Sequence, residues 1–229
     1  LDTYNKIRYK LESGSPYLCL EGAESDNFYL LFDTDRVKTV NQLHEVHFED
    51  FSKPAGDYVI ITHSFFLGPE SPVEAYAQYR SRDYTPVIVN IDRLYDSFAF
   101  GIRGHPLAIR NFIRYIHLNW QVKYILIIGK GLEYPIIRKA EDRETGKRLH
   151  FVPGWGSPPS DQLLAAGPGQ IKPLIPIGRL AVTQPGEIYH YLNKVKEFEA
   201  AVLLPQSIAS KVWLKKILHL SGGSGATEQ

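Results

Sequence analysis

Three short apolar runs constrain this 229-residue chain more than any other feature of its sequence. They read DYVIITH (57–63), VIVNI (87–91) and KYILIIG (123–129), and their apolar residues are consecutive rather than alternating. A strand with such a run has both faces covered, which is the usual state of strands in a parallel sheet. Segments of helical periodicity separate the runs, so the sequence predicts alternating strands and helices.

The helix signals are local and of different kinds. Ser71-Pro72-Val73-Glu74 joins a capping serine to proline at the first helical position and an acidic residue at the third. After Pro106, apolar residues recur with helical spacing on one face, at Ile109, Phe112, Ile113 and Ile116. The predicted helices cover residues 72–83, 92–101, 106–119 and 185–202.

Together these elements predict an α/β fold with a mostly parallel sheet and helices on both of its faces. The predicted strands are 58–62, 87–91, 124–128, 175–182 and 216–220. Between the third and fourth strands, residues 130–173 are rich in glycine, proline and charge. That composition predicts a hairpin or extended loops there.

The first 54 residues have a different pattern. YLCL (17–20) and FYLLF (28–32) are short apolar-aromatic runs separated by a turn-like segment, which is typical of β-structure. Lys53-Pro54-Ala55-Gly56 then marks a boundary. We therefore interpret residues 1–54 as a β-rich segment, the tail of an upstream β domain, and residues 55–229 as the α/β domain.

Composition excludes several classes of protein. With 26 Lys and Arg against 25 Asp and Glu, the net charge of +1 gives no support for a nucleic-acid partner. No apolar run is long enough to span a membrane. The single cysteine rules out an intrachain disulfide and a cysteine-based zinc site. The chain contains no Met, and we interpret it as a piece of a longer protein.

Polar residues and glycines at the carboxyl ends of the predicted strands are the first candidates for a site, because ligands of open parallel sheets bind there. His63 follows the first strand and could act as a general base, although it could equally bond a nearby backbone carbonyl. Asp92 follows the second strand. Asp161 lies in a loop, where it could cap a helix, ligate a metal or bind substrate.

Two glycine-rich turns could bind an anion. Gly129-Lys130-Gly131 follows the third strand, but a third fingerprint glycine and a clear following helix are missing, so a plain turn is the main alternative. Ser221, Gly222 and Gly223 follow the predicted fifth strand without the lysine of a P-loop.

No catalytic constellation is complete. Cys19 lies in the apolar YLCL run and is predicted to be buried and inert. Neither a Gly-x-Ser-x-Gly elbow nor a His-Glu-x-x-His motif occurs, and the residues define no metal site. The residues by themselves predict only a globular α/β domain.

Several segments, taken in order, resemble the gingipain family of cysteine peptidases. They are LLFD (30–33), DYVIITH (57–63), IVNIDRLYDSFAFG (88–101), LAIRNFIRYIH (107–117), YILIIG (124–129), SDQ (160–162), IGRLAV (177–182), KVKEFE (194–199) and ILHLSGG (217–223). The resemblance covers about residues 28–225. It implies a three-layer, caspase-like domain made of two subdomains.

The resemblance also implies that the catalytic His and Cys belong to the second subdomain, beyond Gln229. This chain would then be the non-catalytic first half, and its partners would be the catalytic subdomain and a protein substrate. Family members often carry an acidic residue three positions before IGR, which orients the catalytic His, whereas this chain has Leu174. The family includes a sortase-like peptidase of type IX secretion. The resemblance therefore implies an exported protein that needs no cofactor, and it is compatible with structural calcium.

Two alternatives stay open at this point. One is a binding or scaffold module that has lost peptidase chemistry. The other is a nucleotide-binding α/β domain, which would use the glycine-rich turns.

Overall fold

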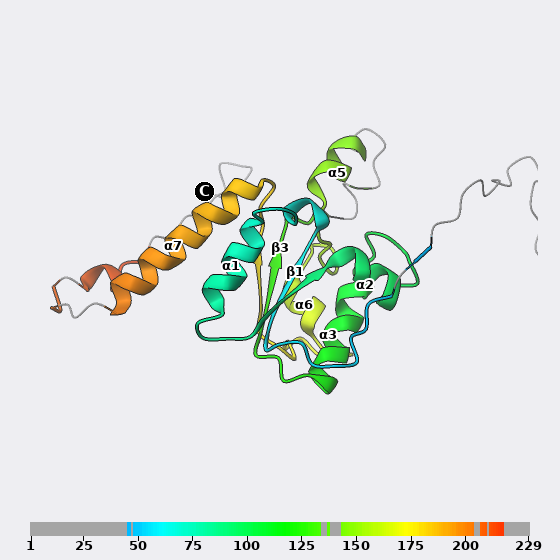
Figure 1. Cartoon of the computed structure of the whole chain (residues 1–229), viewed down its shortest axis with the longest axis horizontal. Coiled ribbons are helices and arrows are strands. Elements are labelled where there is room, and N and C mark those ends of the chain that lie inside the picture. Colours follow the sequence, from blue (N-terminus) through cyan, green and yellow to red (C-terminus); the bar gives the residue numbers. More distant parts are fainter. Residues whose placement is uncertain are drawn as a thin grey trace, which may run out of the picture. The chain divides into compact units, whose positions relative to one another are not determined.

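Among the residues that the computed structural model describes, four parallel strands form the sheet (Figure 1). In chain order they are β1 (Tyr58–Thr62), β2 (Pro86–Asn90), β3 (Tyr124–Ile128) and β4 (Ile177–Leu180), and they lie side by side as β2-β1-β3-β4. The structure describes residues 45–46, 48–133, 137, 143–203, 207–209 and 211–217. Apart from residues 45–46, these belong to one compact unit, His47–Gln229.

The two central strands are the most apolar and the most buried. In the register of the sheet, Ile60 of β1 lies between Ile88 of β2 and Leu126 of β3. Residues 59–61 and 127–128 are fully buried. Because helices cover both faces, a consecutive apolar run suits these strands, and the predicted strands 58–62 and 124–128 are confirmed.

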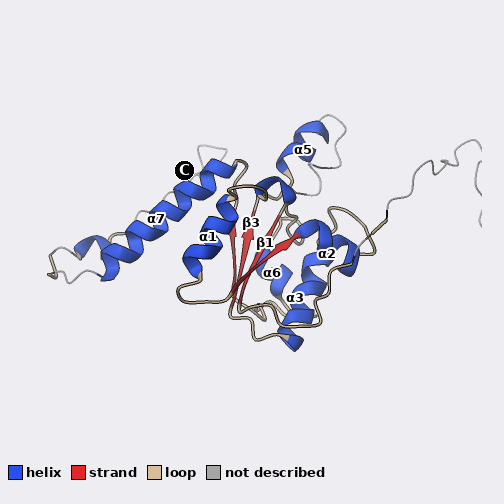
Figure 2. Cartoon of the chain, viewed as in Figure 1, coloured by secondary structure: helices blue, strands red, loops and turns tan. Residues whose placement is uncertain are grey.

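Helices cover the sheet on both sides (Figure 2). On one face lie α1 (Pro72–Arg80) and α7 (Pro185–Leu203), which contact each other. On the other face lie α2 (Ile91–Phe98), α3 (Leu107–Asn119) and α6 (Asp161–Ala165). Among the described residues, the structure also has α5 (Arg143–Leu149) and the 3₁₀ helices η2 (Ser64–Phe66) and η3 (Val212–Lys215). None of the helices among the described residues has the length and apolar character that a membrane crossing requires.

Helix α3 confirms the predicted apolar face. Ile109, Phe112, Ile113 and Ile116 are all fully buried against the sheet side of the helix. Burying each such side chain contributes about 1.5–3 kcal/mol to folding. The helix ends at Asn119, and the indole N–H of Trp120, which follows it, donates to the carbonyl of Phe51 at 3.2 Å.

The structure corrects several predicted elements. The second strand ends at Asn90, and the next helix begins at Ile91 because the Asn90 side chain caps it. The fourth strand is shorter than 175–182. Where the structure describes residues 130–173, they form the helices α5 and α6 as well as loops, and two isolated antiparallel bridges take the place of the hairpin that was one of the two expectations.

Two predicted segments lie mainly outside the described residues. Of the predicted fifth strand 216–220, the structure describes residues 216–217, which have no strand pairing and follow directly on η3. Residues 1–44 are not described, and residues 45–46 and 48–54 contain no strand. The β-rich segment 1–54 and its boundary therefore stay predictions.

Replacing Ser71 by alanine is expected to lower the free energy of unfolding by about 1–2 kcal/mol. The buried Ser71 hydroxyl accepts from the amides of Val73 (3.2 Å) and Glu74 (3.4 Å) and donates to the carbonyl of Phe66 (2.9 Å). Urea unfolding followed by circular dichroism would measure the loss. Ser71→Thr, which keeps a hydroxyl that can both accept and donate, should lose less, and equal losses would contradict a capping role.

Candidate functional site

The carboxyl ends of β1 and β3 meet at the point where the strand order reverses. From β1 the chain runs through α1 to β2, and from β2 it returns through α2 and α3 to β3 on the other side of β1. Open parallel sheets bind ligands outside the strand ends at such a switch point. His63 directly follows β1 and Gly129 directly follows β3, so the fold brings these two predicted residues to that place.

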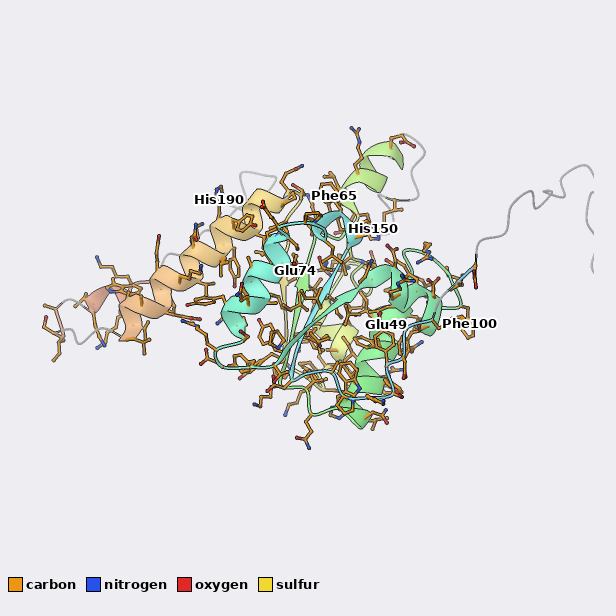
Figure 3. All side chains as sticks on the ribbon, viewed as in Figure 1. Glu49, Phe65, Glu74, Phe100, His150 and His190 are labelled. Carbon is orange, nitrogen blue, oxygen red and sulfur yellow. The ribbon has the colours of Figure 1, made fainter. Side chains whose placement is uncertain are left out.

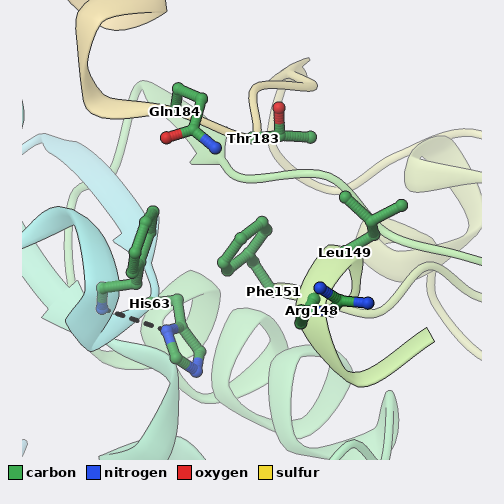
Figure 4. A pocket seen from close by; sticks show the side chains of 7 residues that line it. His63, Arg148, Leu149, Phe151, Thr183 and Gln184 are labelled. Carbon is green, nitrogen blue, oxygen red and sulfur yellow. Dashed lines mark hydrogen bonds between the residues drawn. The ribbon is translucent and has the colours of Figure 1, made fainter. Parts of the chain in front are cut away.

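His63 has a clear structural role at the edge. Its Nδ1 accepts the backbone N–H of Phe65 at 3.0 Å, which caps the short helix η2. Because Nδ1 is an acceptor, the neutral ring carries its proton on Nε2. The ring also packs edge-on against Phe151, with 5.6 Å between ring centroids. His63 therefore orients Phe65 and lines the edge of the sheet (Figure 4).

A cavity of about 600 Å³ opens beside His63 (Figure 4). Its lining residues are His63, Phe65, Arg148, Leu149, Phe151, Thr183 and Gln184. They come from the segments after β1 and β4 and from the end of α5 and the residues that follow it. A volume of this size suits a small molecule or a single side chain with its neighbouring backbone.

Asp92 lies close in sequence and in space to the η2 turn. Its Oδ2 accepts from the hydroxyl of Ser64 at 3.4 Å, and its other carboxylate oxygen is 3.5 Å from Arg103. Arg103 also donates to the Asp92 carbonyl at 2.7 Å and pairs with Asp96 at 2.9 Å. Asp92 thus belongs to an ion-pair cluster at the start of α2 and does not line the cavity.

The turn at Gly129 is built for close packing and not for phosphate. The amides of Gly129 and Lys130 donate to the carbonyls of Leu180 and Val182 at 3.0 and 2.9 Å. With a φ of +132°, Gly129 has a backbone conformation that other residues rarely adopt, and an added Cβ would lie 3.0 Å from the Cβ of Phe151. These two backbone N–H groups are therefore not available to bind a phosphate, as the nucleotide-binding alternative requires at this turn.

Asp161 does not cap α6, because Ser160 does so by accepting from the amide of Leu163. Instead the two oxygens of the Asp161 carboxylate accept from Nε and Nη2 of Arg179, at 2.8 and 2.7 Å. Bidentate pairs of this kind have a fixed geometry and are stronger than neutral hydrogen bonds. The SDQ and IGRL segments, which are 18 residues apart at this pair, are thereby joined.

Arg179 is the residue that sequence reasoning missed. Its guanidinium also donates to the carbonyls of Gly129 (2.8 Å), Val152 (2.8 Å) and Pro153 (3.2 Å). Only 12% of its side chain is exposed. Arg179 thus fastens the segment after α5, which carries Phe151, onto the carboxyl end of β3.

A second histidine was also missed. His150 lies at the end of α5, on the same side of the molecule as Phe65 (Figure 3), and its Nδ1 accepts the amide of Leu132 at 3.0 Å. Burial, together with the positive charge of Arg179 and the proximity of His63, lowers the pKa of His150 to about 4. His150 is therefore neutral at pH 7.

The other predicted residues are not at this edge. Leu174 precedes β4 at the opposite, amino end of the sheet, where its amide donates to the carbonyl of Ala165 at 2.9 Å. Cys19, Ser221 and Gly222 lie outside the described residues. Within the described part of the chain, no group of three or more His, Cys, Asp and Glu side chains is placed to hold a metal ion.

Comparison with known proteins agrees with the resemblance seen in the sequence. The model of Peptidase family C25 matches residues 51–229, which is more than half of the chain. No curated protein and no solved structure matches. The matched range includes all four strands, the Asp161–Arg179 pair and the cavity beside His63. The family model covers the whole parallel sheet and the helices that flank it. This chain therefore belongs to Peptidase family C25, the gingipain family.

Proposed function

We propose that this chain is the non-catalytic first half of a gingipain-like cysteine peptidase domain in an exported bacterial protein. One observation carries the proposal: the peptidase family model matches residues 51–229, and these residues contain no cysteine. A cysteine peptidase needs a thiolate nucleophile with a histidine that carries its proton. The nucleophile and its histidine then come from a segment that follows residue 229 in the same polypeptide.

In this proposal the chain supplies the sheet and the loops against which the catalytic half is assembled. The Asp161–Arg179 pair and the turn at Gly129 hold the carboxyl edge of the sheet in one arrangement. The full domain acts on a protein substrate, either as a secreted endopeptidase or as a sortase-like enzyme. Its activity is hydrolysis or transfer at a peptide carbonyl through an acyl-enzyme.

One observation favours a second candidate, a binding module without peptidase activity. Where the resemblance implies an acidic residue that orients the catalytic histidine, this chain has Leu174. A leucine side chain offers no acceptor for an imidazole N–H, so the histidine of the full domain would lack that support. In the alternative, the same fold binds a protein partner without cutting it.

The test compares residues 1–229 with the polypeptide extended through the segment that follows. We expect no turnover of a quenched fluorescent peptide library by residues 1–229, because they contain no Cys-His pair. The extended polypeptide should cleave members of the library and lose this activity when its own strand-end cysteine is replaced by alanine.

Cys19→Ser in the extended polypeptide is the matched control, and we expect it to leave the rate of cleavage unchanged. Turnover by residues 1–229 alone would contradict the proposal. Loss of cleavage by the extended polypeptide when it carries Cys19→Ser would contradict it as well. An extended polypeptide that binds peptides without cleaving them would favour the binding module.

A further inference from the structure

We propose that the cavity beside His63 binds an aromatic carboxylate. This chemistry is shared by the C-terminal aromatic residue of a peptide and by a free aromatic acid. The cavity of about 600 Å³ lies at the strand ends where the order of the sheet reverses, which is where folds of this kind place their ligands. The inference does not depend on peptidase activity, because every lining residue belongs to this chain.

An aromatic platform forms one wall of the cavity. The rings of Phe65 and Phe151 are stacked, with 5.3 Å between centroids and 25° between planes. Phe151 is buried, whereas 49% of Phe65 is exposed to solvent. Figure 4 shows Phe151 at the centre of the lining, with Leu149 beside it. An aromatic ligand ring that covers Phe65 would remove apolar surface from water and add a stacking partner.

The charge of the lining selects an anion. Among the seven lining residues Arg148 is the one with a permanent charge, and none is an Asp or Glu. The nearest carboxylate in sequence, Glu187, has one oxygen that accepts from the Thr183 amide (2.7 Å), the Thr183 hydroxyl (3.4 Å) and the Gln184 amide (2.9 Å). An arginine beside an apolar wall suits a ligand that has a carboxylate next to a ring.

Both rings of the aromatic wall are held in place before any ligand arrives. Phe65 is fixed through its amide, which donates to His63 at 3.0 Å. Phe151 is fixed by its own amide, which donates to the Lys130 carbonyl at 2.9 Å, and by its packing on Gly129. A site that is already formed loses less entropy on binding than one that must be ordered.

The experiment measures binding to residues 1–229 by isothermal titration calorimetry, with N-acetyl-phenylalanine and N-acetyl-phenylalaninamide as probes. We expect the carboxylate to bind about tenfold more tightly than the amide, which is the size of one charge-assisted hydrogen bond. Arg148→Gln should remove this preference and leave the amide affinity unchanged. Lys172→Gln, which removes an exposed positive charge outside the lining, is the matched control and should retain the preference.

Phe65→Ala tests the aromatic wall and should weaken both probes about tenfold. Phe65→Leu is the second variant, for the case that alanine disturbs the η2 turn, and it should weaken them less. A peptide that ends in phenylalanine and binds as well as the acetylated amino acid would identify a peptide terminus as the source, whereas preference for the single amino acid would identify a free acid. Equal affinities of acid and amide for the unaltered chain, or unchanged affinities in Phe65→Ala, would overturn the inference.

Discussion

An Arg179→Ala variant is expected to lose about 3–5 kcal/mol of unfolding free energy, the usual cost of removing one partner of a largely buried ion pair. The substitution leaves the Asp161 carboxylate, 26% exposed, without its bidentate partner. It also removes the donor shared by the carbonyls of Gly129 and Val152. Each buried acceptor that loses its hydrogen bond adds its own desolvation cost. Urea unfolding at pH 7.5, followed by fluorescence and by circular dichroism, would measure the change.

Arg82 provides the matched control for this loss. It also pairs with a carboxylate, that of Glu199 at 3.1 Å, but 54% of its side chain is exposed. Exposed pairs contribute about 0–1 kcal/mol, so Arg82→Ala should be nearly neutral. Arg179→Lys keeps the charge without the planar fork and should fall between the two. If Arg179→Ala and Arg82→Ala were equally mild, Arg179 would not hold the edge of the sheet.

The central strands could be predicted because consecutive apolar residues in the sequence indicate a strand that is buried on both faces. Residues 59–61 and 125–128 are buried in a sheet that helices cover on both faces, so no polar residue alternates with them. The face of α3 could be predicted for a similar reason, because its apolar residues follow the helical repeat. The short helices α5 and α6 could not, because five to seven residues are too few to show a repeat.

The candidate site was predictable in its place but not in its chemistry. The predicted order of strands and helices already indicates that ligands bind at the carboxyl ends of the strands. His63 and Gly129 could therefore be selected from the sequence, because each directly follows a strand. Asp161 and Arg179 pair across 18 residues of loop and strand, and no local pattern marks such a contact. His150 shows no signal in the sequence either, because its burial depends on Arg179 holding the neighbouring segment in place.

Acid is expected to destabilise the fold through His150. Its pKa is about 4 in the folded chain, against an ordinary value of 6.5, mainly because burial disfavours the charged ring. The unfolded chain therefore binds a proton more readily between these two values, so stability is complete above about pH 6.5 and falls as the pH drops toward 4. At pH 5 the loss from this one group is about 2 kcal/mol. Urea unfolding at pH 7.5 and at pH 5 would measure it.

His150→Asn isolates this contribution from that of the carboxylates, which also titrate in acid. The Asn side-chain oxygen can replace Nδ1 as the acceptor of the Leu132 amide, and it does not titrate. The variant is expected to be somewhat less stable at pH 7.5, because the amide fills less space than the ring. Its loss between pH 7.5 and pH 5 should nevertheless be about 2 kcal/mol smaller than that of the unaltered chain. His117→Asn, at an exposed histidine in the last turn of α3, should not reproduce the difference, and equal acid losses in all three proteins would show that His150 is not buried as a neutral ring.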